Sequence, residues 1–147
     1  MPSTHTSLHY HLIFSTKLRE PLISPAWRNE FHSYLGGTVK GLHAHPEGVG
    51  GVADHVHLLV SLKPTTCLSD FIRELKKSSS AWARESKCPG FQWQEGYAAF
   101  TVSASVRDAV RSCISNQEEH HREKTFREEL VEFLEKSGVA YDPQHLD

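Results

Sequence analysis

The stretch Asp54-His-Val-His-Leu-Leu-Val-Ser-Leu62 decides the fold of this chain, because it has the pattern of a β-strand with two different faces. Side chains alternate across a strand, so His55 and His57 leave the same face. The apolar residues leave the other face, where a core can bury them: Val56, Leu58, Val60 and Leu62. Two neighbouring imidazoles suit a divalent metal but need a further ligand. The spacing alone is equally compatible with ordinary hydrogen-bonded histidines.

The rest of the chain alternates between strand and helix patterns. We expect strands over residues 7–15 and near 41–48, and a loop followed by a strand over 92–102. The glycines of residues 48–51 favour a hairpin into the His55 strand. We expect helices from Pro25, over 70–85 and over about 106–122, and an amphipathic segment from Phe126 to Gly138. This order predicts an α+β fold, ferredoxin-like or RRM-like, with an antiparallel sheet, packed helices and a C-terminal helical extension.

Length and composition predict a single domain over residues 1–147, with a helical tail over about 123–147. No apolar run reaches the roughly 18 residues of a membrane span, and the N-terminus lacks the pattern of a signal peptide. We therefore expect a cytoplasmic protein with no membrane partner. The three cysteines have no CxxC spacing, which argues against a disulfide scaffold and a cysteine zinc site.

The charge balance indicates that any phosphate-binding surface is local. Sixteen basic and eighteen acidic residues give a formal charge of −2, unlike a strongly basic nucleic-acid binder. Acidic residues concentrate between Glu118 and Glu135, where we expect a solvated face distant from nucleic acid. The proposed phosphate contacts, for which a merely solvated basic face is the alternative, are Lys17, Arg19, Arg73, Lys76 and Lys77.

The expected helix over 106–122 carries Cys113 and Gln117 four residues apart, so both project from one face. Cys113 is compatible with a small hydrophobe that continues a buried stripe. Gln117 is a polar residue on the same stripe and needs a partner, which a metal or a phosphate would supply.

Five segments, in order and spanning nearly the whole chain, resemble a known family. They are His11-Leu-Ile-Phe-Ser-Thr-Lys17, Gly51-Val-Ala-Asp-His-Val-His-Leu-Leu-Val-Ser-Leu62, residues 68–82, Trp93-Gln-Glu-Gly-Tyr-Ala-Ala-Phe-Thr-Val-Ser103 and Ser112-Cys-Ile-Ser-Asn-Gln-Glu-Glu-His-His121. The chain resembles the HUH-type single-strand DNA transposases of bacterial insertion sequences, including the REP-associated tyrosine transposases.

The resemblance implies a Mg²⁺ or Mn²⁺ ion held by His55, His57 and Gln117. It implies that a tyrosine attacks the scissile phosphate to leave a 5′-phosphotyrosine link and a free 3′-OH. It also implies a homodimer that recognises single-stranded DNA with hairpins at element ends or REP sequences, in a bacterial, nucleoid-associated setting. His9 and His11 correspond to a strand that supplies packing in the family, although both could still line a DNA groove.

The chain departs from the family pattern at the nucleophile, because Cys113 stands where the family has tyrosine. A thiol is several ångströms shorter than a phenol, and its sulfur matches a hard cation poorly. We therefore expect reduced or absent strand cleavage, with the fold, the metal site and DNA binding retained. Tyr97 is an alternative phenol, better suited to a core or base-stacking role. A cleavage-inactive DNA-binding protein with a repressor or housekeeping role and a metal-dependent hydrolase are the competing hypotheses.

Overall fold

A computed structural model describes residues 3–117 and 125–142. Its centre is a four-stranded antiparallel sheet in the order β2-β3-β1-β4. The strands are β1 (His9–Ser15), β2 (His45–Val52), β3 (His55–Ser61) and β4 (Ala98–Val102). Together with the alternating helices, this order confirms the predicted α+β, ferredoxin-like class.

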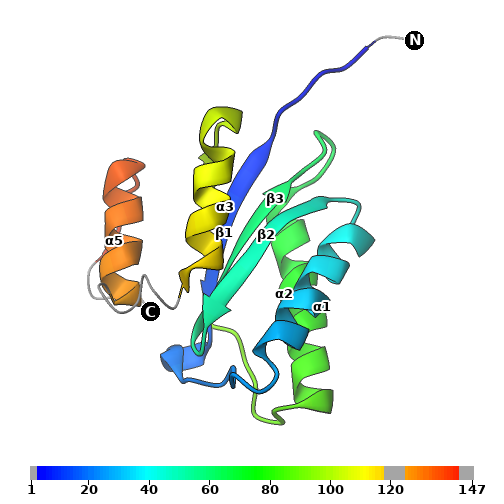
Figure 1. Cartoon of the computed structure of the whole chain (residues 1–147), viewed down its shortest axis with the longest axis vertical. Coiled ribbons are helices and arrows are strands. Elements are labelled where there is room, and N and C mark those ends of the chain that lie inside the picture. The colour runs from blue at the N-terminus through cyan, green and yellow to red at the C-terminus, as the bar shows by residue number, and fades with distance from the viewer. Residues whose placement is uncertain (1–2, 118–124, 143–147) are drawn as a thin grey trace.

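The helices lie on both faces of the sheet (Figure 1). Helices α1 (Arg28–Gly41) and α2 (Leu68–Ser86) cover one face, and α3 (Arg107–Ser115) and α5 (Phe126–Lys136) lie on the other. Short 3-10 turns follow β1 at Lys17–Arg19 and precede α3 at Ala104–Val106. The His55 strand therefore lies inside a three-layer arrangement.

The main core lies between the sheet and the pair α1 and α2. Val56, Leu58 and Val60 of β3 are fully buried there, as the alternation in the sequence predicts. Phe31 of α1 and Leu75 of α2 pack in the same core. The opposite face of β3 is left for the two histidines and Leu59, so the strand is apolar on one side and mainly polar on the other.

Three boundaries differ from the sequence predictions. The first helix begins at Arg28, because residues 24–27 form a turn closed by a hydrogen bond from the Trp27 N–H to the Ser24 carbonyl (3.1 Å). It then continues to Gly41, so β2 starts at His45 rather than near 41. The third helix ends at Ser115, where Asn116 leaves helical geometry at φ −108° and ψ 34°, while residues 118–122 of the prediction lie outside the described residues.

The glycine-rich segment lies within β2 and does not form the hairpin turn. A Cβ on Gly50 would lie 2.0 Å from the Ile114 carbonyl oxygen, and one on Gly48 would lie 3.3 Å from Cγ of Arg111. Both neighbours belong to α3. Glycine is needed at position 50, where the helix backbone crosses the strand at close range, whereas at Gly48 a small shift of the Arg111 side chain would make room for a Cβ. The prediction that these glycines lead into an antiparallel hairpin is correct for β2 and β3, but their structural role is packing.

Candidate metal centre and nucleic-acid interface

His55 and His57 are fully buried on the α3 and α5 side of β3. Their ring centroids are 5.0 Å apart, so the two imidazoles are direct neighbours. Phe126, the first residue of α5, stacks on the His55 ring with the centroids 4.2 Å apart. The histidine pair is thus enclosed between the sheet and the helical layer.

The Nδ1 atom of each histidine has a partner that orients its ring. His55 Nδ1 lies 2.8 Å from Asp54 Oδ1, and His57 Nδ1 lies 2.8 Å from Nε2 of His11 on the neighbouring strand β1. A histidine that binds a cation through Nε2 carries its proton on Nδ1, and a carboxylate or another acceptor fixes that tautomer. Both rings are therefore held in an orientation that suits metal ligation through Nε2.

The two Nε2 atoms face oxygen atoms from the helical layer. His55 Nε2 lies 3.3 Å from Oε1 of Gln117, and His57 Nε2 lies 2.9 Å from Oε1 of Glu129 on α5. The ligand atoms of His55, His57 and Glu129 all lie within 4.8 Å of one another. Ligands about 2.1 Å from one ion are separated by up to about 4.2 Å, so a small closure would complete a site.

The donor set fits a divalent cation. It combines two imidazole nitrogens, one amide oxygen and one carboxylate oxygen. Oxygen ligands suit Mg²⁺ and Mn²⁺, whereas imidazole shifts the preference toward later transition metals. The buried carboxylate of Glu129 would offset part of the ion's charge, so this centre could hold a divalent metal.

The sequence does not predict that Glu129 and His11 belong to this cluster. Glu129 is only 7% exposed and faces His57, so it departs from the expected solvated acidic face, to which Glu128 and Glu135 do belong. Its helix places one acidic residue on the apolar stripe with Leu130 and Leu134, a periodicity that the sequence shows. His11 packs as predicted, yet it directly contacts His57, and this contact depends on the register of β1 on β3.

His11 is electrically neutral under ordinary conditions. Burial, and secondly the neighbouring His57, lowers its pKa to about 3, against a smaller opposing effect of Glu129. A neutral imidazole can accept a hydrogen bond from His57 Nδ1 without adding positive charge next to a cation. This state is compatible with an orienting role for His11.

Cys113 and Gln117 are close along the chain, but they differ in burial. Gln117 is 3% exposed, and its Nε2 donates to the Cys113 carbonyl oxygen at 3.3 Å. Cys113 is half-buried on α3. Tyr97 precedes β4 and is 44% exposed, in a hollow of about 320 Å³ that Phe126 also lines, so it is not a core residue.

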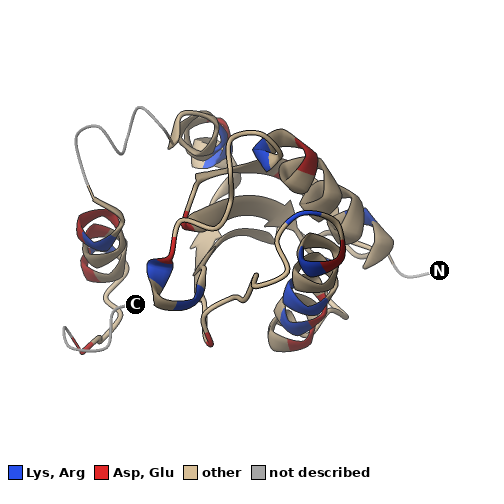
Figure 2. Ribbon diagram, turned by 90° about the horizontal axis from the view of Figure 1, so that it is seen from below, with Lys and Arg blue, Asp and Glu red and all other residues tan. Residues whose placement is uncertain are grey.

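Part of the predicted basic set lines one hollow. Lys17, Lys76 and Lys77 surround a cavity of about 500 Å³ together with Arg84 and Trp93. Figure 2 shows basic residues repeated along α2, which forms one wall of this hollow. The indole of Trp93 packs against Phe14, and its Nε1 donates to Ser79. This hollow is a concentrated positive surface on a chain that is slightly acidic overall.

The members of the basic set have different environments. Lys76 donates to the carbonyl oxygens of Gln94 (2.6 Å) and Gly96 (2.8 Å), and burial lowers its pKa although Glu95 acts in the opposite direction. Arg19 lies over the Phe126 ring at 5.8 Å, next to the histidine pair. Arg73 pairs with Asp70 at 3.1 Å on the exposed face of α2.

Comparison with known proteins identifies the family of this chain. The family model described as "Transposase IS200 like" matches residues 4–117, and the chain belongs to this family of transposases. The ISDra2 transposase TnpA of Deinococcus radiodurans is 29% identical over 119 residues, which cover 75% of this chain and 84% of that relative.

Two solved structures share the fold. A crystal structure described as a candidate transposase from Deinococcus radiodurans R1 has a TM-score of 0.65 and 24% identity, and the match covers 80% of this chain and 95% of that one. A REP-associated tyrosine transposase bound to a REP hairpin has a TM-score of 0.60 and 13% identity, with 97% and 93% covered. Within residues 3–117 and 125–142, no helix is both long and apolar enough to cross a membrane.

Proposed function

We propose that this transposase family member binds single-stranded DNA that contains a hairpin and holds Mg²⁺ or Mn²⁺ with His55, His57 and Gln117. The carrying observation is that the Nε2 atoms of two oriented histidines face oxygens of Gln117 and Glu129 in a buried cluster. Glu129 is a fourth ligand or an acceptor beside the ion. We further propose that the chain works as one domain over residues 1–147 and as a homodimer in the bacterial cytoplasm, at the nucleoid.

A bound divalent cation supplies polarisation of the scissile phosphate. The residues around it have separate tasks in this proposal. Asp54 and His11 hold the two imidazoles so that both Nε2 atoms stay directed at the same space. Gln117 supplies a neutral oxygen, which binds the ion without repelling a phosphate. Phe126 excludes water from one side of the His55 ring.

Lys17, Lys76 and Lys77 provide the DNA-binding surface, with Arg19 and Arg73 as outer phosphate contacts. The support is the shared basic hollow of the three lysines and the position of Arg19 over the ring of Phe126, which stacks on His55. A fold neighbour was solved with a REP hairpin bound, which makes a hairpin the first substrate to test. Contacts to phosphates provide affinity and orient the DNA, whereas contacts to bases provide sequence specificity.

Cys113 limits the chemistry. It occupies the position at which the family has its tyrosine nucleophile, one helical turn before Gln117. Its reference pKa of about 8.5 is lower than the value of about 10 for tyrosine, so acidity is not the obstacle. The obstacles are the shorter reach of the thiol and the poor match of sulfur to a hard cation. Strand cleavage is therefore strongly reduced, and a cleavage-inactive DNA-binding protein is the second candidate that Cys113 favours.

A nicking assay separates these candidates. A hairpin-flanked oligonucleotide is incubated with Mn²⁺ and either the unsubstituted chain or Cys113→Tyr, and covalent adducts are resolved on denaturing gels. In the substituted chain the phenolate oxygen bonds to phosphorus while the P–O3′ bond breaks, so the product is a protein–5′-phosphate adduct and a free 3′-OH. Adduct formation only with Cys113→Tyr supports a descendant that has lost cleavage but kept its site.

A second substitution in the Cys113→Tyr chain provides the control. Cys113→Tyr combined with His57→Ala should give no adduct, because one proposed ligand is missing. Nicking without any adduct by either chain would indicate water attack and favour a metal-dependent hydrolase. Failure of both chains to bind the hairpin oligonucleotide at low salt would overturn the DNA-binding proposal.

A further inference from the structure

Helix α3 has little apolar attachment to the sheet. Within Arg107–Ser115, all of which the structure describes, Ile114 is the one buried residue. It packs with Leu59 and Val102 near the C-terminal end of the helix, and a half-buried Val110 joins them. A helix fixed at one end by a single buried side chain needs a second attachment to set its direction.

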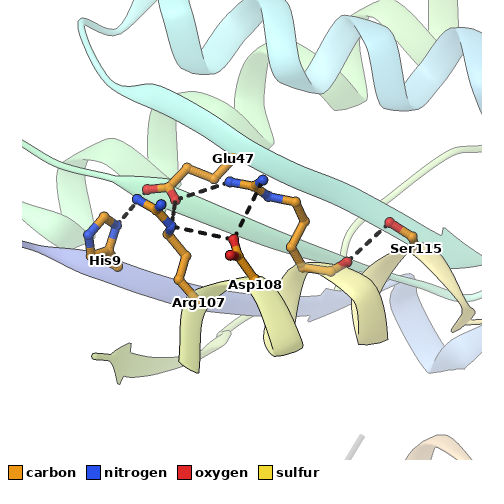
Figure 3. Close-up of polar contacts among 6 residues, drawn as sticks. His9, Glu47, Arg107, Asp108 and Ser115 are labelled. Atoms are coloured by element: carbon orange, nitrogen blue, oxygen red, sulfur yellow. Dashed lines mark hydrogen bonds and ion pairs between the residues drawn. The ribbon is translucent and has the colours of Figure 1, made fainter. Parts of the chain in front are cut away.

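A buried carboxylate on β2 provides that second attachment (Figure 3). The Glu47 side chain is 2% exposed, and its Oε2 lies 3.3 Å from Arg107 Nε and 3.7 Å from an Arg111 nitrogen. Its Oε1 lies 2.5 Å from Nδ1 of His9. Asp108 lies within 4.0 Å of Arg107 and 3.8 Å of Arg111 and links the two guanidinium groups from the solvent side. These contacts lie in the N-terminal half of α3.

A β-bulge directs Glu47 toward α3. The pairing of β2 with β3 passes from Pro46 opposite Val60 to Gly48 opposite Leu59, so Glu47 is the extra residue. In a regular strand Glu47 and Gly48 would face opposite sides, but the bulge allows both to face the helix. Arg111 therefore contacts both positions.

We infer that Glu47 is a positioning residue of the metal centre, which fixes α3 through Arg107 and Arg111 and so holds the Gln117 amide beside His55. Gln117 follows the helix by two residues, and its oxygen is 3.3 Å from His55 Nε2. With the Glu47 attachment removed, α3 pivots about Ile114 and the amide moves relative to the ring. This inference rests on the proposed function only in its claim that Gln117 binds the ion.

The test uses Glu47→Gln, which keeps the shape of the side chain and removes its charge. Mn²⁺ affinity is measured by titration with EPR detection, well below the unfolding temperature of each variant. We expect about tenfold weaker binding, as found when groups behind metal ligands are removed. On a Gln117→Ala background the same change should have no further effect, because Glu47 acts through that amide. Glu30→Gln, which removes an exposed ion pair with Lys87 (2.9 Å), is the matched control and should bind normally.

A second readout needs no metal. The side-chain amide signals of Gln117 in ¹H–¹⁵N NMR spectra should shift in Glu47→Gln and stay in place in Glu30→Gln. If Glu47→Gln does not fold, Arg107→Gln and Arg111→Gln remove the same ion pairs from partly exposed positions.

The outcomes separate the two proposals. Unmoved Gln117 signals, unchanged Mn²⁺ affinity in Glu47→Gln, or full additivity with Gln117→Ala would each overturn the positioning role and leave the metal site intact. Normal Mn²⁺ affinity in Gln117→Ala would instead overturn the ligand set, while shifted Gln117 signals in Glu47→Gln would still support the positioning of α3.

Discussion

Substitution of Gly50 by alanine tests how closely α3 must approach the sheet. The added Cβ would lie 2.0 Å from the Ile114 carbonyl oxygen and 2.9 Å from its carbonyl carbon. Ordinary contacts between carbon and oxygen are about 3.3 Å, so α3 must move away by about 1 Å. The obstructing atoms are backbone atoms, which cannot be relieved by a rotamer change. We expect a loss of about 1–3 kcal/mol in the free energy of unfolding, typical of overpacking.

The same displacement should reach the metal centre. Gln117 Oε1 is 3.3 Å from His55 Nε2, and a shift of about 1 Å at the end of α3 separates the amide from a shared ion. We therefore predict that Gly50→Ala weakens Mn²⁺ binding by at least about tenfold in the folded protein. Urea denaturation followed by circular dichroism measures the stability, and isothermal titration measures the affinity.

Gly37→Ala provides the matched control. Gly37 lies inside α1, where an added Cβ meets nothing within 4 Å. Alanine should stabilise that helix by about 0.5–1 kcal/mol and leave Mn²⁺ affinity unchanged. Wild-type stability and wild-type Mn²⁺ affinity in Gly50→Ala would refute the reasoning, because they would mean that α3 does not lie on Gly50.

Four further predictions concern other residues. Cys113→Tyr should raise covalent adduct formation on a hairpin oligonucleotide from undetectable to readily seen on a denaturing gel; equal adduct yields from both chains would contradict this. Lys77→Ala should lower the slope of the logarithm of the DNA-binding constant against the logarithm of the salt concentration by about one unit, with no change in stability. Lys76→Met should instead lower the free energy of unfolding in urea by about 1–3 kcal/mol, because two carbonyl groups lose their donor. Burial and, secondly, Arg28 lower the pKa of His32 from 6.5 to about 4, so the unfolded chain takes up a proton first as the pH falls, and stability decreases from pH 6.5 toward pH 4. His32→Gln should lose less unfolding free energy than the wild type between pH 7 and pH 5. Equal losses in the two proteins would contradict the claim that His32 causes this pH dependence.

Periodicity was enough to predict the sheet and the face of the histidine pair. The alternation around Val56 and Leu58 predicts one apolar side that a core buries, and the structure shows that α1 and α2 cover that side. Periodicity did not predict the role of the glycines in β2, because a close crossing by α3 depends on tertiary packing. It also did not locate the end of α3 at Ser115, after which Asn116 leaves helical geometry although the apolar pattern continues to Gln117 without a glycine or proline.

The candidate site was predictable in its two histidines and its amide, and less so in its surroundings. A polar residue on a buried stripe needs a partner, which singles out Gln117 in the sequence, and in the structure its amide lies beside His55. Glu129 was assigned to a solvated acidic face because net charge over a segment hides the one carboxylate that points inward. The contact of His11 with His57 required the register of β1 on β3, which alternation within one strand does not provide.

A crystal structure of the protein soaked with Mn²⁺, with the ion located from its anomalous scattering, tests the proposed metal centre most directly. We predict one ion about 2.1 Å from the Nε2 atoms of His55 and His57 and from Oε1 of Gln117. An ion bound elsewhere, or an ion on the histidines with the Gln117 amide turned away in every subunit, would contradict the proposal.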